Sequence, residues 1–272
     1  MGWTFALVSR DPNLVGCVLH AVDAQRPLVP PGAVSAWGLG YYVGGEPLLE
    51  RQPSPRGPFE VKTLAQDIES EVLLAAASNG HGAKDENTQP FRFRRWLFAH
   101  AGEVPDFQLA MPALHRGLPE AVRGQRKGET ASEYVFLYVL QKLRELNALE
   151  DDVPAATAGR ALREGIAALE SVLRDAGVTR PASLQCVLTN GRSLAVSRVG
   201  GPCSSRLIEG LVPCGRCGID EKTPEMHPAL RPHRRLRAAA FVSEDGVPGF
   251  QPLAERSLVT VSPQLEIKNE PL

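Results

Sequence analysis

Cysteines and histidines gather late in the chain in a pattern that is typical of metal ligands. Cys214 and Cys217 form a Cys-x-x-Cys turn flanked by glycine, which presents two thiolates to one metal ion. Cys203, together with His227 or His233, would complete a tetrahedral zinc site. This interpretation gives a structural zinc ion held by Cys203, Cys214, Cys217 and His227.

Two other interpretations of the same segment remain open. The Cys-x-x-Cys pair would be a redox dithiol, but it lacks the strand-to-helix setting that lowers the pKa of a thiol. A second Cys-x-x-Cys or a His-x3-His, either of which would make the zinc motif strong, is absent from the sequence. A loop with unliganded cysteines is therefore the favoured interpretation. We expect a Cys/His/Arg-rich insertion or loop at about 200–237.

The composition excludes several classes of protein. With 272 residues, of which 43% are hydrophobic, the chain can bury one large core. Its formal net charge of -1 gives no global attraction to nucleic acid or to an anionic membrane. No apolar run approaches the roughly 20 residues of a membrane span. We expect a cytoplasmic protein with an unknown protein partner or a small metabolite as ligand. The arginines of 231–237 could bind an acidic partner or phosphate, although such runs are usually solvated.

Several short segments carry a second pattern, and it is specific when they are taken together. They are Trp37 and Gly38 in a glycine-rich strand, Asn-Thr-Gln-Pro-Phe at 87–91, Phe-Ala-His-Ala-Gly at 98–102, and Gly-Glu-Thr-Ala-Ser-Glu at 128–133. In this order they resemble the class II, or N-terminal nucleophile, glutamine amidotransferases, and especially the short stand-alone members of that family. The resemblance implies an α+β fold, a four-layer αββα sandwich, in a single domain over residues 1–272, and no cofactor.

The chain carries glycine or alanine wherever this family does chemistry. The resemblance places the nucleophilic cysteine, with its free α-amine as base, at Gly2 behind Met1. Ala101 stands in place of the asparagine that donates to the oxyanion, a loss that typically costs about 100- to 1000-fold in rate. Ala76 and Ala131 stand where an arginine and an aspartate would pair with the carboxylate and the ammonium of glutamine. Cys17 cannot replace the nucleophile, because an internal cysteine has no α-amine.

Residues that shape the pocket in the family are kept, and these are Trp37, Gly38, Asn87, Phe91, His100 and Gly102. The resemblance gives His100 a structural role. We therefore expect a catalytically degenerate member of the family that acts as a binding or regulatory protein. The alternative is an amidohydrolase or amidotransferase that acts on a γ-glutamyl or other amide compound with relocated residues. That alternative requires His100 to converge with a polar group such as Ser78, Asn79 or Ser132.

Hydrophobic periodicity indicates the elements that would position these residues. Apolar or alternating runs predict strands at 3–8, 36–43, 72–77, 92–99, 236–243 and 257–262, and a hairpin of 184–188 with 193–199 about Asn190 and Gly191. Helical periods predict helices at 59–71, from Thr130 through 149 behind a capping box with Glu133, and at 155–176. Residues 105–127 are expected to be irregular or a short helix. Strands on both sides of two long helices favour sheets stacked between helical layers.

Overall fold

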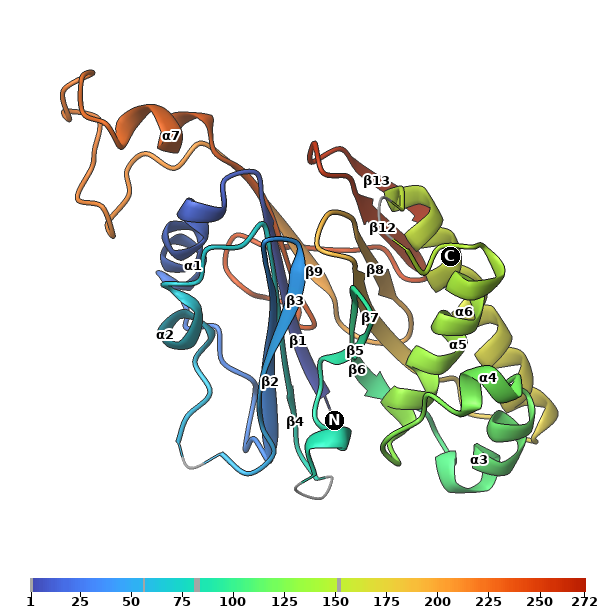
Figure 1. The fold of residues 1–272 in the computed structure, drawn as a ribbon. Coiled ribbons are helices and arrows are strands. Elements are labelled where there is room, and N and C mark those ends of the chain that lie inside the picture. Colours follow the sequence, from blue (N-terminus) through green and yellow to red (C-terminus); the bar gives the residue numbers. More distant parts are fainter. Residues whose placement is uncertain (1, 56, 81–83, 151–152) are drawn as a thin grey trace.

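The computed structural model describes residues 2–55, 57–80, 84–150 and 153–272. Within these ranges, two antiparallel sheets face each other and helices cover the outer face of each (Figure 1). The layers therefore follow the expected αββα order. None of the helices in the described ranges is long and apolar enough to cross a membrane.

The first sheet is built around the N-terminal strand β1. Its order is β11-β9-β10-β1-β4-β2-β3. The strands are β1 (Gly2–Ser9), β2 (Ala36–Val43), β3 (Glu46–Gln52), β4 (Val72–Ser78), β9 (Ser204–Glu209), β10 (Arg237–Val242) and β11 (Gln251–Pro252). Strand β1 pairs with β10 on one side and with β4 on the other. It is buried on both faces, which explains why its sequence is a continuous apolar run rather than an alternating one.

The second sheet has the order β13-β12-β8-β7-β6-β5. Its strands are β5 (Phe91–Phe93), β6 (Trp96–Glu103), β7 (Ser183–Thr189), β8 (Leu194–Arg198), β12 (Ser257–Val261) and β13 (Ile267–Pro271). Strands β7 and β8 form the hairpin expected at Asn190 and Gly191, and Gly191 supplies the positive φ, +89°, that such a turn needs.

Helices cover the outer faces of the two sheets. Against the first sheet lie α1 (Val15–Asp23) and α2 (Val61–Ala65), and against the second lie α3 (Phe107–Arg116), α4 (Glu120–Arg123), α5 (Ala131–Glu145) and α6 (Ala155–Asp175). Short 3-10 turns occupy Pro12–Leu14 and Asp85–Asn87, and α7 (Leu230–Arg235) extends beyond the end of the first sheet (Figure 1). Each helical layer packs on its sheet through an apolar core. A third apolar core lies between the two sheets, and Leu74, Leu97 and Phe241 contribute to it.

The structure differs from the expected elements mainly where side chains bond across the fold. The predicted helix at 59–71 is helical only from Val61 to Ala65. Beyond it, the buried Ser70 hydroxyl accepts from the backbone N–H of Tyr42 and donates to the carbonyl of Val72, which holds the chain in the entry to β4. The predicted strand at 92–99 is split into β5 and β6 by a turn at Arg94, whose φ is +53°. The segment 105–127 contains α3 and α4.

Candidate functional site

A cavity of about 620 Å³ opens where β1 begins and β4 ends. The first sheet contributes Gly2 at the start of β1 and Ser78 at the end of β4, and the second contributes His100 and Gly102 of β6. The rest of the described lining is Asn79, Asn87, Gln89, Glu103, Val104, Asp106, Phe107, Gln108, Leu109, Thr130, Ala131 and Ser132. The cavity thus collects residues from most of the segments that carried the family pattern.

Gly2 lines the cavity and lies against Ala101, which is buried and outside the described lining. A Cβ placed on Gly2 would lie 3.0 Å from the carbonyl oxygen of His100 and 3.3 Å from the Cα of Ala101. Real Cβ atoms seldom approach other atoms this closely, so β1 packs against β6 about as tightly as a glycine permits. The structure therefore brings these two expected positions together, and neither offers a nucleophile or a side-chain hydrogen-bond donor.

His100 is buried and both of its ring nitrogens are engaged. Nε2 lies 3.0 Å from the carbonyl oxygen of Ser183, and Nδ1 lies 2.9 Å from the hydroxyl of Ser132. A carbonyl can only accept, so Nε2 carries the proton and the Ser132 hydroxyl donates to Nδ1. Burial lowers the pKa of His100 to about 4. At neutral pH the ring is therefore uncharged, and it joins β6 to β7 and to the start of α5.

The side chains of Gln89 and Asn87 fix the loop that precedes β5. The Gln89 amide donates to the carbonyl of His100 at 2.9 Å and accepts from its N–H at 2.6 Å, as a neighbouring strand would. Asn87 Oδ1 accepts from the backbone N–H of Glu129 at 2.9 Å. A Cβ on Gly128 would lie only 2.4 Å from that oxygen, so this close approach requires glycine. The segments 87–91 and 128–133, which both carry the family pattern, thus contact each other through Asn87 and the backbone of Gly128 and Glu129.

The start of α5 points toward the cavity. Thr130 is the N-cap, and its hydroxyl accepts from the N–H of Glu133 at 3.2 Å. The carboxylate of Glu133 accepts from the backbone N–H groups of Lys127 and Gly128, instead of returning to Thr130 as a capping box would. Ala131 is the first residue of the helix and presents only a methyl group to the cavity.

The other expected framework residues lie outside the described lining. Trp37 packs beneath the helices of the first sheet, stacked on Phe59 with ring centroids 5.1 Å apart. Phe91 stacks on Phe136 in the core of the second sheet. A Cβ on Gly38 would lie 2.3 Å from the carbonyl oxygen of Gln89, so this glycine lets the loop approach β2. These residues support the cavity wall from behind.

Ala76, which the resemblance placed at the glutamine carboxylate, is also outside the lining. It is buried in the core between the sheets, and Ser78 follows two residues later on the same face of β4 and reaches the cavity. Counting residues along the chain without gaps does not show whether residue 76 or residue 78 of β4 would face a ligand.

Sequence reasoning missed the acidic mouth of the cavity. Glu103 and Asp106 are exposed lining residues, and Arg180 lies 3.8 Å and 3.3 Å from their respective carboxylates. No lysine or arginine occurs in the lining that the described residues form. The segment 103–109 carried no clear helical period, and Pro112 interrupts the pattern of α3. Its acidic residues therefore gave no signal in the sequence.

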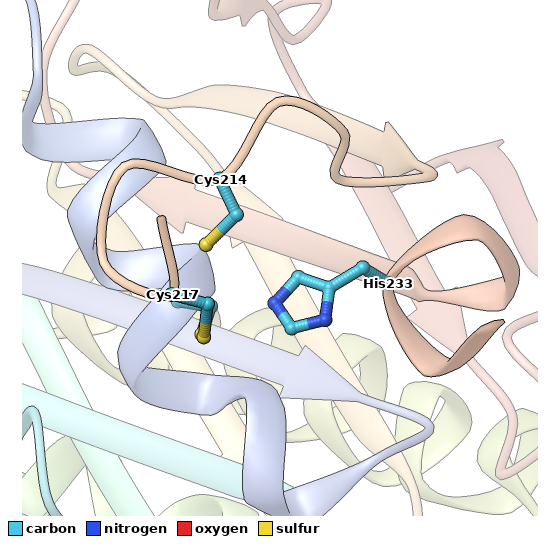
Figure 2. Close-up of side chains that lie close together, drawn as sticks. Cys214, Cys217 and His233 are labelled. Carbon is cyan, nitrogen blue, oxygen red and sulfur yellow. The ribbon is translucent and has the colours of Figure 1, made fainter. Parts of the chain in front are cut away.

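The late cysteines are divided between two places. Cys214, Cys217 and His233 lie together (Figure 2), and the Sγ atom of Cys17 of α1 lies within 4.8 Å of their ligand atoms. Cys203 belongs instead to the core between the sheets, because it immediately precedes β9 and the sheet fixes its direction. His227 is exposed in a turn, and its ring accepts from the N–H of Ala229. The cluster thus differs from the expected ligand set by exchange of Cys203 and His227 for Cys17 and His233.

Comparison with known proteins agrees with the family pattern. The family model described as glutamine amidotransferases class-II matches residues 19–209. A solved glutamine aminotransferase class-II domain protein from Silicibacter pomeroyi is 20% identical, with a TM-score of 0.60, over 100% of this chain and 99% of that one. A predicted glutamine amidotransferase from Pseudomonas aeruginosa is 16% identical, with a TM-score of 0.53, over 98% of this chain and 97% of that one.

A larger enzyme shares the fold over part of its length. Glutamine phosphoribosylpyrophosphate amidotransferase from Bacillus subtilis is 10% identical, with a TM-score of 0.52, and the match covers 99% of this chain and 49% of that enzyme. No curated protein matches the sequence. At sequence identities of 10–20%, these solved structures support a conclusion about the fold alone. They confirm the αββα sandwich.

Proposed function

Because the chain belongs to the class-II glutamine amidotransferases, we propose that it keeps the cavity of that family without hydrolysing glutamine and uses the cavity to bind a small polar metabolite. The main support for this proposal is that an open cavity adjoins Gly2, which has no side chain. The cavity above it remains open, about 620 Å³, and yet the residue where the nucleophile would stand has no side chain. An open cavity lined by both polar and apolar side chains supports ligand binding rather than a purely structural scaffold.

The absence of glutamine hydrolysis follows from what glutamine chemistry needs. Acyl transfer requires a nucleophile and donors aimed at the developing oxyanion, and Gly2 and Ala101 provide neither through their side chains. Glutamine also carries a carboxylate, which needs a cationic partner when it is taken from water. The described lining offers amides, hydroxyls and two carboxylates, but no cationic side chain.

The same lining supports a ligand with hydrogen-bond donors. Glu103 and Asp106 at the mouth share one cation, Arg180, and the remaining net negative charge favours an amine or another cation. The carbonyl oxygens of side-chain amides such as Gln108 accept from an amide or a hydroxyl. Val104, Phe107 and Leu109 supply an apolar wall. The ligand class is therefore a small, uncharged or cationic metabolite with amine or amide groups, and the protein has a binding or regulatory role.

The purified chain is expected to release no ammonia from glutamine above the buffer background. Removing the nucleophile of a hydrolase alone costs on the order of a million-fold in rate. The measurement is an ammonia assay at millimolar glutamine, repeated after the thiols have been alkylated. A solved relative with glutaminase activity serves as the positive control. Glutamine hydrolysis that alkylation abolishes would overturn the proposal.

Filling the cavity is expected to abolish ligand binding without unfolding the protein. Ala131→Leu adds apolar volume at the cavity wall, whereas Ala121→Leu adds the same volume at an exposed position of α4. A panel of small amines and amides is screened by thermal unfolding. A ligand at 100 times its Kd stabilises by about 2.7 kcal/mol and should raise Tm by about 5–10 °C in the unsubstituted chain.

The shift should persist in Ala121→Leu and vanish in Ala131→Leu. Equal shifts in all three proteins would place binding outside this cavity. A panel in which no compound shifts Tm, at concentrations that reach millimolar, would contradict the ligand class.

A second candidate function rests on the Ser132–His100 hydrogen bond, which has the geometry of a nucleophile and its base. Two observations count against it. A base works best with a pKa near the working pH, and burial lowers that of His100 to about 4. The other ring nitrogen donates to a backbone carbonyl rather than to a carboxylate that would stabilise an imidazolium. Hydrolysis of an amide that survives alkylation and is lost in Ser132→Ala would favour this candidate.

A further inference from the structure

We propose that Cys17, Cys214, Cys217 and His233 bind one zinc ion, and that this ion fastens the segment 210–236 to helix α1. The four ligand atoms, three Sγ and one imidazole nitrogen, all lie within 4.8 Å of one another. The chain offers them from three places that are distant in sequence, namely α1, the Cys-x-x-Cys turn and α7. Figure 2 shows Cys214, Cys217 and the ring of His233 pointing into the same space.

The spacing of the ligand atoms fits a tetrahedral ion. With Zn–S bonds of about 2.3 Å and Zn–N bonds of about 2.0 Å, the corners of a tetrahedron are about 3.8 Å apart for two sulfurs and about 3.5 Å apart for a sulfur and a nitrogen. The Sγ atoms of Cys17 and Cys217 are 3.4 Å apart, and no pair of ligand atoms is more than 4.8 Å apart, so small movements of the side chains give the tetrahedral spacing. Three thiolates with one imidazole are also a ligand set that zinc uses in closed structural sites.

His233 provides an independent indication of a bound ligand. The residue is 1% exposed, and its Nε2 is a buried polar atom without a hydrogen-bond partner. Its Nδ1 lies 2.8 Å from the carbonyl oxygen of Ala229 and so carries the proton. Nε2 is then an unprotonated acceptor. Metal-binding histidines usually donate their second nitrogen to a carbonyl or carboxylate in this way, and a buried polar atom without a partner calls for such an explanation.

The Cys-x-x-Cys turn is already shaped to present both sulfurs. Cys214 and Ile219 exchange two backbone hydrogen bonds, of 2.9 Å and 3.2 Å, which close the turn around Cys217. Gly218 adopts a φ of +65°, a conformation that suits glycine. Arg216, within the turn, lies over Gly16 of α1 and donates to Asp67 at 2.8 Å. The turn is thus held against α1, next to Cys17.

The surrounding segment has little regular secondary structure, although Ile219 packs in the core of the first sheet and Leu230 is buried. Between β9 and β10 the chain runs from Gly210 to Leu236 with α7 as its one helix among the described residues. Loops of this length with little secondary structure are usually functional or disordered. A structural zinc ion contributes folding free energy directly. On binding, the thiols become thiolates and their protons pass to solvent. A Cys17–Cys217 disulfide would leave Cys214 and the Nε2 of His233 without a role.

The test measures metal content in the whole chain and in single variants. Protein purified under reducing conditions with zinc should carry roughly one equivalent by elemental mass spectrometry. Cobalt in its place should give the intense visible bands of a tetrahedral site and a thiolate-to-cobalt charge-transfer band. Cys217→Ser and His233→Ala should each weaken zinc binding by more than about 100-fold, since even partners outside the ligand set cost 10- to 100-fold.

Matched controls come from the same stretch of sequence. Cys203→Ser and His227→Ala remove the same residue types but should keep the full metal content and the cobalt spectrum. If a ligand variant does not fold, a mercurial titration of the unsubstituted chain replaces it, and zinc should be released as the thiols are modified. Zinc well below one equivalent in the reduced protein would overturn the proposal. Loss of metal in the control variants, or a Cys17–Cys217 crosslink in the zinc-loaded protein, would also overturn it.

Discussion

Gly102→Ala is expected to lower the free energy of unfolding by about 3–5 kcal/mol, the sum of backbone strain and overpacking. Gly102 has a φ of +131°, where side chains are rarely tolerated, and a Cβ there would lie 2.0 Å from the carbonyl oxygen of Ser183. That oxygen is backbone of the neighbouring strand β7 and cannot move aside as a flexible side chain would. The measurement is urea unfolding followed by circular dichroism.

Gly177→Ala is the matched control for this substitution. Gly177 also has a positive φ, +83°, but an added Cβ would meet nothing within 4 Å. Alanine there should cost only the backbone term, about 1–2 kcal/mol. The difference between the two variants isolates the clash with β7. Equal destabilisation by both would show that the approach of β6 to β7 at this point is not what requires glycine.

The second large effect is a pH dependence that comes from His100. Burial holds its pKa at about 4, against 6.5 for an ordinary histidine. Between these two values the unfolded chain takes up a proton that the folded protein does not. The contribution of His100 to the free energy of unfolding is therefore largest above about pH 6.5. It declines as the pH falls from 6.5 toward 4 and no longer changes below about pH 4. The difference corresponds to on the order of 3 kcal/mol.

The change in the free energy of unfolding between about pH 4 and 6.5 is measured by chemical unfolding at several pH values. The substitution His100→Gln should reduce this slope. Carboxylates titrate nearby and contribute their own slope, so the comparison between the variant and the unsubstituted chain is the relevant quantity. An unaltered slope in His100→Gln would mean that folding does not lower the pKa of His100.

The sequence was sufficient for elements that rest on local patterns. The strand Ala36–Val43, the helices α5 and α6, and the hairpin at Asn190 and Gly191 follow from alternation, helical period and turn chemistry. The helix α1 and the strand β3 were not predicted, since neither showed a clear period. Helix α2 ends at Ala65, before the end of its apolar period, and Ser70 beyond it bonds across the sheet to Tyr42, a contact that no local pattern reveals.

Contacts between distant residues limited the prediction of both sites. Cys203 was grouped with Cys214 because they are near in sequence, but β9 separates them, whereas Cys17 comes close only through the packing of α1. At the cavity, Gly2, Ala101 and Ala131 were placed together by family resemblance, because small side chains carry no chemical signal of their own. Glu103 and Asp106 needed the structure, because only their position makes them lining residues.

The two ends of the segment 210–236 meet. The N–H of Gly210 donates to the carbonyl of Leu236 at 2.8 Å, and Glu209 pairs with Arg237 in the ladder of β9 and β10. In the sheet, these strands are therefore a hairpin whose turn has been expanded into a separate lobe. Both ends of the lobe are paired in this ladder and β10 in turn pairs with β1, while Ile219 of the lobe packs in the core of the first sheet and Leu230 is buried. The lobe therefore adjoins the end of β1, and the cavity adjoins its beginning.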